Sequence, residues 1–294
     1  MTDRDFTGYG RTPPDPHWPN GARIALNFVL NHEEGGEESL PDGDPRSETA
    51  LTEGSTAPVK GRDLAAESMF QFGSRVGFWR IHRLLTDRAL PCTVFAVARA
   101  LERTPDAAAA MVEAGWDICG HGLRWEMHAG MEEAKERARI AEATAIIERL
   151  TGARPKGWYT RYAASENTRR FLAEAGYLYD CDAYDDELPY WRTVKGKPHL
   201  VIPYTLTHND VRFQRAALTT GEEFFAYIRH ACELMLTEPG GRILSVGLHN
   251  RIIGHAGRAS GLAKLLDWAK AQEGIWICRR ADIAAHWMKE HPAT

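Results

Sequence analysis

Two adjacent glutamates, Glu33 and Glu34, stand in the segment "NHEEGGEE" (31–38), which follows the apolar run 22–30 where a buried strand is expected to end. The next two residues, Gly35 and Gly36, are typical of a loop. Two acids in one pocket raise the pKa of one of them by like-charge repulsion, which suits proton transfer near neutral pH. The pair therefore predicts a general base, and a solvated turn is the simpler alternative.

Other polar side chains also stand where predicted strands end. They are His121, Trp158, Tyr159, Arg161, Asp180, Asp182, His249 and Arg251. Parallel α/β barrels build their active sites from the loops at the carboxyl ends of the strands. Taken singly, each residue has a structural alternative, since a lone histidine is more often a core residue and Asp180 suits a cap. Five such strand ends together predict one catalytic site.

The elements that must position these residues alternate between strand and helix almost to the end of the chain. Strands are predicted at 22–30, 92–98, 116–122, 156–160, 177–182, 199–205, 242–249 and 274–279. Helices are predicted at 64–85, 106–115, 131–152, 166–176, 221–236, 259–272 and 281–291. This alternation indicates an α/β fold, with a parallel sheet covered by helices and closed or partly closed into a barrel. We expect a single domain over residues 1–294, with an N-terminal arm (about 1–20) and a long polar loop (about 37–62).

The composition excludes several classes of function. A net charge of −4, with both signs interspersed, provides no basic face for nucleic acid or for an anionic membrane. No run of about 18 apolar residues occurs, and the polar N-terminus is unlike a secretory signal. The five cysteines are scattered without a Cys-x-x-Cys pair, which favours a reduced, cytoplasmic protein without a thiolate zinc site. The expected partner is a small-molecule substrate.

Long stretches of the chain resemble one superfamily. The segments "IALNFVLNHEEGGE", "GSRVGFWRI", "TGARPKGWYT", "LPYWRTVKGKPHLVIPYTL" and "LSVGLHNRIIGHAGR" are similar to the polysaccharide deacetylase (NodB-homology) superfamily, and within it to the cofactor-independent allantoinase branch of urate catabolism. The resemblance covers nearly the whole chain. It implies a distorted parallel (β/α) barrel of about seven strands that hydrolyses a C–N bond.

The resemblance also bears on metal binding. In the metal-dependent members the first motif supplies two acids, whose place is taken here by Glu33 and Glu34, and the second supplies two histidines four residues apart. The second motif reads "HGLRWEMH", with His121 at the first ligand position and Trp125 at the second. His128 is seven residues from His121 and does not have the expected spacing. No cofactor is therefore expected, and the alternative is a divalent metal such as zinc held by Glu34 and His121.

The resemblance implies a role for each site residue. One of Glu33 and Glu34 is the general base, His249 is the general acid, His121 orients water or polarises the carbonyl, and Asp180 orients a catalytic histidine or arginine. The residues expected to contact substrate are Trp125, Trp158, Tyr159, Arg161, Trp191 and Arg251. The three tryptophans would wall the pocket, and the two arginines would bind the ureide or carboxylate group of the substrate.

The expected function is hydrolysis of a cyclic amide, namely allantoin or a related ureide, hydantoin or imide. The loop "TRYAASENTRR", the segment "WEMH" and Asn250 depart from the allantoinase pattern, so the choice of ring stays open. A carbohydrate N-deacetylase that depends on a metal is the first alternative, and an inactive ligand-binding barrel is the second. The resemblance further implies a homo-oligomer, with a tetramer as the expected form.

Overall fold

The computed structural model describes residues 4–54, 59–161 and 163–293. The first three residues of the predicted arm and residues 55–58 of the predicted polar loop lie outside this range. Within it, nine strands form one sheet: β1 (Ile24–His32), β2 (Thr93–Ala96), β3 (Asp117–Gly120), β4 (Gly157–Trp158), β5 (Tyr179–Asp180), β6 (Tyr190–Val194), β7 (Lys197–Val201), β8 (Arg242–His249) and β9 (Ile275–Ile277).

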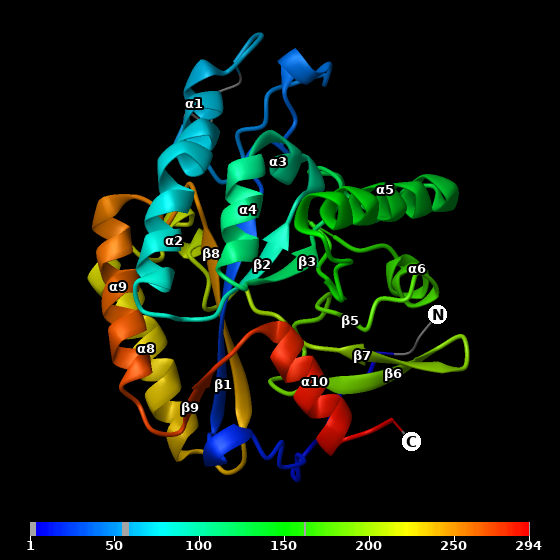
Figure 1. The fold of residues 1–294 in the computed structure, drawn as a ribbon, viewed down its shortest axis with the longest axis vertical. Helices are drawn as coiled ribbons and strands as arrows, with labels where there is room; N and C mark the ends of the chain where they lie inside the picture. The colour runs from blue at the N-terminus through cyan, green and yellow to red at the C-terminus, as the bar shows by residue number, and fades with distance from the viewer. Residues whose placement is uncertain (1–3, 55–58, 162, 294) are drawn as a thin grey trace.

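The strand order is β6-β7-β5-β4-β3-β2-β1-β8, and β9 pairs with the first half of β1. Every neighbouring pair is parallel except β6 and β7. From β7 to β8 the path contains seven parallel strands, which curl around the long central β1 into an open barrel (Figure 1). The predicted distorted parallel (β/α) barrel is confirmed.

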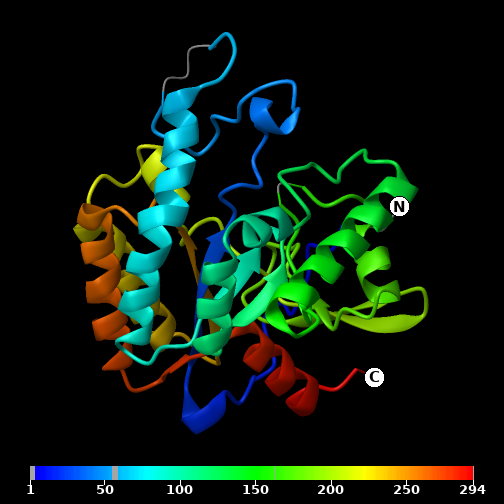
Figure 2. The same cartoon turned by 45° about the horizontal axis from the view of Figure 1, so that its top comes forward.

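Helices surround this sheet, and most of them cover its outer face. They are α1 (Leu64–Phe72), α2 (Phe78–Thr86), α3 (Ala98–Arg103), α4 (Pro105–Glu113), α5 (Glu133–Thr151), α6 (Thr168–Glu174), α7 (Val211–Gln214), α8 (Gly221–Thr237), α9 (Ala256–Lys270) and α10 (Arg280–Glu290). Helices α2, α8 and α9 stand side by side next to β1 and β8, and α10 lies near the amino end of β1 (Figure 1). Helix α1 extends beyond the carboxyl end of β1 (Figure 2). No helix of the described residues is both long and apolar enough to cross a membrane.

The central strand β1 is buried along all nine residues and separates two apolar layers. On its outer face Ile24, Leu26, Phe28 and Leu30 pack with residues of the covering helices. On its inner face Ala25 and Val29 pack with side chains of the other strands inside the barrel. Because side chains alternate along a strand, the residue after β1 continues the inner face and the next one continues the outer face.

Several elements differ from the sequence-based predictions. Strands β6 and β7 form an antiparallel hairpin, whereas only 199–205 was predicted as a strand in this region. Their two-residue turn places Lys195 at φ 51° and Gly196 at φ 75°, the left-handed geometry that suits a tight hairpin. The predicted strand 92–98 ends at Ala96, where α3 soon begins, and the short helix α7 was not predicted. The other predicted strands and helices are present, although β4 and β5 are shorter than expected.

The predicted helix 64–85 is interrupted by a π-helical turn, Gly73–Gly77. A Cβ at Gly73 would lie 2.6 Å from Oε1 of Glu34, and one at Gly77 would lie 2.0 Å from the backbone oxygen of Asn250. The two glycines therefore let this helix approach the ends of β1 and β8 more closely than any side chain would allow. π-Helical turns of this kind are frequent at functional sites.

We expect Gly77→Ala to lower the free energy of unfolding by about 2–3 kcal/mol, because the added methyl group overlaps a backbone carbonyl that cannot rotate away. Denaturant unfolding followed by circular dichroism measures this change. Gly257→Ala in α9 is the matched control, since nothing lies within 4 Å of its Cβ, and it should raise stability by up to about 1 kcal/mol. Equal stability of the two variants would contradict the packing argument.

Candidate functional site

The alternation of side chains sorts the predicted residues onto two faces at the carboxyl edge of the sheet. Glu33, His121, Arg161 and His249 turn toward the barrel interior, where they contact one another. A second set turns toward the covering helices and comprises His32, Glu34, Trp158, Asp180 and Asn250. Adjacent residues in the sequence therefore belong to different environments, and only the first set gathers around one point.

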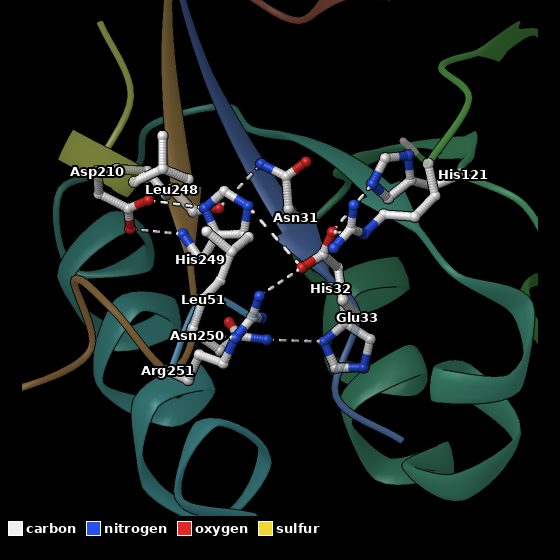
Figure 3. A network of polar contacts seen from close by, with 12 residues as sticks. Asn31, His32, Glu33, Leu51, His121, Asp210, Leu248, His249, Asn250 and Arg251 are labelled. Atoms are coloured by element: carbon white, nitrogen blue, oxygen red, sulfur yellow. Dashed lines mark hydrogen bonds and ion pairs between the residues drawn. The ribbon is translucent and has the colours of Figure 1, made fainter. Parts of the chain in front are cut away.

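Glu33 is the centre of the inner set and is buried (Figure 3). Its Oε1 lies 3.2 Å from Nε2 of His121 and 2.9 Å from Nε of Arg161. Its Oε2 accepts a hydrogen bond of 2.9 Å from Nη2 of Arg251 and lies 3.8 Å from Nε2 of His249. One carboxylate is thus shared by two guanidinium groups and two imidazole rings.

These contacts change the acidity of Glu33. Burial alone would raise its pKa, but the guanidinium groups of Arg161 and Arg251 hold the pKa well below the usual glutamate value. The pKa of Arg251 is raised despite its burial, because both Glu33 and Glu34 face it. The sequence predicted that like-charge repulsion raises the pKa of one of the two acids, but for Glu33 the two neighbouring cations outweigh burial and the pKa falls.

His121 is fixed at both ring nitrogens. Its Nδ1 lies 2.7 Å from the carbonyl oxygen of Tyr159, so this nitrogen carries a proton that it donates. The ring also stacks on that of Tyr159, with centroids 5.0 Å apart. Burial lowers the pKa of His121, which leaves Nε2 facing Glu33 as the nitrogen free to exchange a proton. The ring cannot turn without losing the Tyr159 contact.

His249 is oriented by an aspartate that sequence reasoning missed. Oδ1 of Asp210 lies 2.6 Å from Nδ1 of His249, and Oδ2 accepts from the backbone N–H groups of His249 and Ile253 at 2.7 and 3.1 Å. Asp210 is fully buried at the start of α7. Its three hydrogen bonds hold the imidazole so that Nε2 points at Glu33 (Figure 3). This arrangement is an Asp-His pair of the kind that stabilises a protonated imidazole.

Glu34 occupies the outer face and has different partners. Its Oε2 accepts from Nδ2 of Asn250 at 2.8 Å, and its Oε1 accepts from the backbone N–H and Nη1 of Arg251 at 3.2 and 3.1 Å. Glu34 and His121 were predicted as the ligand pair if a metal binds, but the structure turns them to opposite faces. Glu33, not Glu34, is the carboxylate that reaches His121.

The donor set at this point does not suit a divalent metal ion. A catalytic metal needs about three protein ligands, whereas the carboxylate beside His121 already faces two guanidinium groups. Trp125, at the position of the second histidine, lies under the guanidinium of Arg161, with Cζ 3.7 Å from the ring centroid. Nowhere in the described ranges do three His, Cys, Asp or Glu side chains gather in a way that could hold a metal.

Asp180 is the main correction among the predicted catalytic residues. It lies on the outer face of β5, where it pairs with Arg169 of α6 at 2.6 and 2.9 Å and with Nε2 of His199 at 3.0 Å. Asp180 therefore orients a histidine and an arginine, as expected, but not those around Glu33. Its two neighbours, Tyr179 of β5 and Cys181 just after it, turn inward instead.

The aromatic residues predicted to contact substrate also lie in different environments. Tyr159 and Trp125 contact the site residues His121 and Arg161, respectively. Trp158 is fully buried on the outer face, where its ring packs on Gly120 and its Nε1 donates to Thr160. Trp191 lies on the edge strand β6, and its Nε1 donates to the backbone oxygen of His291. These contacts give no support to the pocket role predicted for the last two tryptophans, which stays a prediction.

The inner set is closed to solvent in this structure. The four side chains of the inner set, and that of Arg251 beside them, are each less than 8% exposed. Part of the cover comes from the predicted polar loop, since the backbone oxygen of Leu51 accepts a 3.1 Å hydrogen bond from Nε of Arg251. The same loop is tied down by Asp44, which forms a two-pronged ion pair with Arg124 at 3.0 and 2.5 Å. Access by a substrate therefore requires a movement of this cover.

Sequence reasoning also missed His32, and it noted Asn250 only as a departure from a pattern. His32 precedes the two glutamates and shares the outer face with Glu34, so counting by twos from Glu34 would have paired them. Asp210 lies 39 residues before His249 in a turn without periodic pattern. Its only signal is a carboxylate beside a bend, which is too common to single it out.

Comparisons with known proteins show which family this chain is similar to. A family model described as polysaccharide deacetylase matches residues 62–179. A Schizosaccharomyces pombe protein named as a polysaccharide deacetylase of this kind is 35% identical over 314 aligned positions, which cover 98% of each chain. The crystal structure of PuuE allantoinase is 48% identical with a TM-score of 0.95, and each chain is covered completely. A Pseudomonas aeruginosa PAO1 structure from the polysaccharide deacetylase group is 46% identical, with a TM-score of 0.93 over 99% of each chain.

Proposed function

Since the chain belongs to the polysaccharide deacetylase family, in its allantoinase branch, we propose that it is a hydrolase that opens the C–N bond of a cyclic amide. Allantoin or a related ureide, hydantoin or imide is the proposed substrate. The observation that carries the proposal is the single carboxylate, Glu33, held between two arginines and two histidines at the barrel mouth. The complete coverage of PuuE allantoinase at 48% identity supports the choice of a ring amide.

Ring opening requires an activated water, a stabilised oxyanion and a proton for the departing nitrogen. We assign the first task to Glu33, because it alone of the two glutamates faces both histidines. Its low pKa makes it a weak base in the closed site. A substrate whose carbonyl or ureide groups draw Arg161 or Arg251 away would remove the cause of that low pKa, so binding itself would strengthen the base.

The proposed reaction includes two proton transfers, one to Glu33 and one from His249. Glu33 takes a proton from water while the water oxygen adds to the ring carbonyl carbon, and the oxyanion forms beside the guanidinium groups. The C–N bond then breaks, and the proton on Nε2 of His249 passes to the ring nitrogen. Asp210 stabilises the imidazolium that donates it. Tyr159 fixes the ring of His121, and Nε2 of that ring, 3.2 Å from Oε1 of Glu33, can receive the proton that Glu33 takes from water.

We also propose that the reaction needs no metal, because the donors around Glu33 are matched to guanidinium groups. In a chelation experiment, the protein dialysed exhaustively against a chelator should retain full activity, with no metal found by elemental analysis. Activity that returns only with Zn²⁺ or Co²⁺ would overturn the metal-free mechanism. It would leave the choice of substrate unaffected.

The substrate class is tested with a pH-indicator assay across allantoin, hydantoin, succinimide and N-acetylglucosamine oligomers, with acetate measured in parallel. Ring opening of one or more cyclic amides is the expected result. The deacetylase names of the relatives favour the alternative, a carbohydrate N-deacetylase. Release of acetate from the oligomers without ring opening would establish that alternative instead.

A further inference from the structure

A row of hydrogen bonds lies behind Glu34, on the face of the sheet that turns away from the reacting groups, and runs from the half-buried Thr104 to the buried His32 and Asn250. The hydroxyl of Thr104 donates to the backbone oxygen of Ala100 at 2.7 Å, and its oxygen lies 2.8 Å from Nε2 of His32. Nδ1 of His32 lies 3.1 Å from Nδ2 of Asn250 (Figure 3). The same Nδ2 donates to Glu34 at 2.8 Å. These hydrogen bonds link the end of α3 to the ends of β1 and β8.

The donor and the acceptor of each of these hydrogen bonds can be assigned, starting from the backbone carbonyl of Ala100. A backbone carbonyl only accepts, so the single hydroxyl proton of Thr104 is committed to Ala100, and the oxygen must accept from Nε2–H of His32. A neutral His32 then presents a bare Nδ1, which can accept from the amide of Asn250. Full burial of His32, which lowers its pKa, keeps the ring in this neutral form.

The amide of Asn250 is held by two acceptors at once. Its NH₂ group faces both Oε2 of Glu34 and Nδ1 of His32, and its own Oδ1 is buried without a hydrogen-bond partner among the described atoms. The orientation of the Asn250 amide is therefore set by its NH₂ group and not by Oδ1. A reversed amide would place that oxygen against a carboxylate and a bare imidazole nitrogen, both of which repel it.

The orientation of Glu34 matters to the reacting carboxylate through Arg251. Oε1 of Glu34 accepts from Nη1 of Arg251, while Nη2 of the same guanidinium donates to Glu33 at 2.9 Å. The plane of a guanidinium is rigid, so a carboxylate that turns at Nη1 also turns the group that faces Glu33. The outer and inner sets are coupled at this one side chain.

We propose that Thr104, His32 and Asn250 are positioning residues: they fix one orientation of Glu34 and thereby hold the Arg251 guanidinium against Glu33. The inference about geometry stands on the hydrogen bonds alone. Its consequence for turnover rests on the proposed cyclic-amide hydrolysis.

The test replaces Thr104, the end of the hydrogen-bond chain that is farthest from Glu34, because this residue contacts none of the reacting groups. Thr104→Val keeps the shape of the side chain but removes the acceptor for Nε2 of His32, and Thr104→Ser keeps the hydroxyl. We expect Thr104→Val to lower kcat about ten- to hundredfold with a smaller effect on KM, and Thr104→Ser to restore it. Nitrogen-15 NMR of His32 should show a proton on Nε2 in the wild type and in the serine variant, and a mixture of tautomers in the valine variant.

Thr144→Val is the matched control, because the hydroxyl of Thr144 also donates to a helix carbonyl, that of Ile140, and contacts Tyr177. It should lower stability without changing kcat or the His32 tautomer. An unchanged His32 tautomer and kcat in Thr104→Val would overturn the proposal, and so would an equal loss of kcat in Thr144→Val. If the wild type opens no cyclic amide, the proposed function fails, and the NMR comparison still decides the positioning chain.

Discussion

Replacing Asp210 with asparagine should lower kcat by about 10⁴-fold while the protein stays folded, a loss of the size seen when the aspartate of a catalytic Asp-His pair is changed in this way. The asparagine oxygen would still accept from the backbone N–H groups of His249 and Ile253, so its NH₂ group would face Nδ1 of His249. A donor at that place forces the proton to the other ring nitrogen and disfavours the imidazolium that must protonate the leaving nitrogen. Steady-state kinetics on the substrate found in the assay panel, together with circular dichroism, measure this effect.

Asp180→Asn separates this assignment from the sequence-based one. Asp180 is equally buried and also faces a histidine and an arginine, His199 and Arg169, on the other side of the sheet. Its replacement should lower the melting temperature but change kcat of the folded protein by less than about tenfold. If both variants lost activity to the same extent, Asp210 would have no special relation to His249.

Glu33→Gln should reduce kcat by at least about 10³-fold, because an amide neither takes a proton from water nor balances the two arginines. The same change leaves Arg161 and Arg251 without their shared carboxylate, which costs about 3–5 kcal/mol of stability for a buried pair. Activity is therefore measured per folded molecule, with the folded fraction taken from denaturant unfolding. KM should change less than kcat.

Glu37→Gln is the control for Glu33→Gln, since Glu37 lies four residues away and accepts from the backbone N–H of Gly35 rather than from a site residue. It should keep near wild-type turnover. The acid limb of the stability profile gives a second readout. A glutamate whose folded pKa is lowered contributes stability that is complete above its unfolded pKa, about 4.5, and is lost as the pH falls through the lower folded value. A Glu33→Gln variant with wild-type kcat would refute the role of this carboxylate.

Much of the site follows from local sequence. A strand that is apolar throughout, followed by two acids and two glycines, places Glu33 at the carboxyl end of a buried parallel strand, and His121, Arg161 and His249 follow other strands in the same way. Parallel strands bring their carboxyl ends to one edge, so the convergence of these residues could be predicted before any distance was known.

The face on which each residue lies could also be read from the strands, but only with the exact strand ends. Asp180 and Trp158 were assigned to the pocket because each ends a strand, yet each is one position out of step with the inward residue beside it, Cys181 and Tyr159. A shift of one residue reverses the face, and strand ends are the least certain part of any sequence-based assignment.

The sequence by itself determined the alternation of strands and helices, the family, and the edge at which the chemistry lies. Only the tertiary structure decided that Glu33 rather than Glu34 meets both histidines, that Asp210 orients His249, and that two arginines lower the pKa of the central carboxylate. The physical reason is the same in each case. Hydrogen bonds and ion pairs act over about 3 Å between residues far apart in the chain, and neither periodicity nor composition records which of two neighbouring side chains comes within that distance.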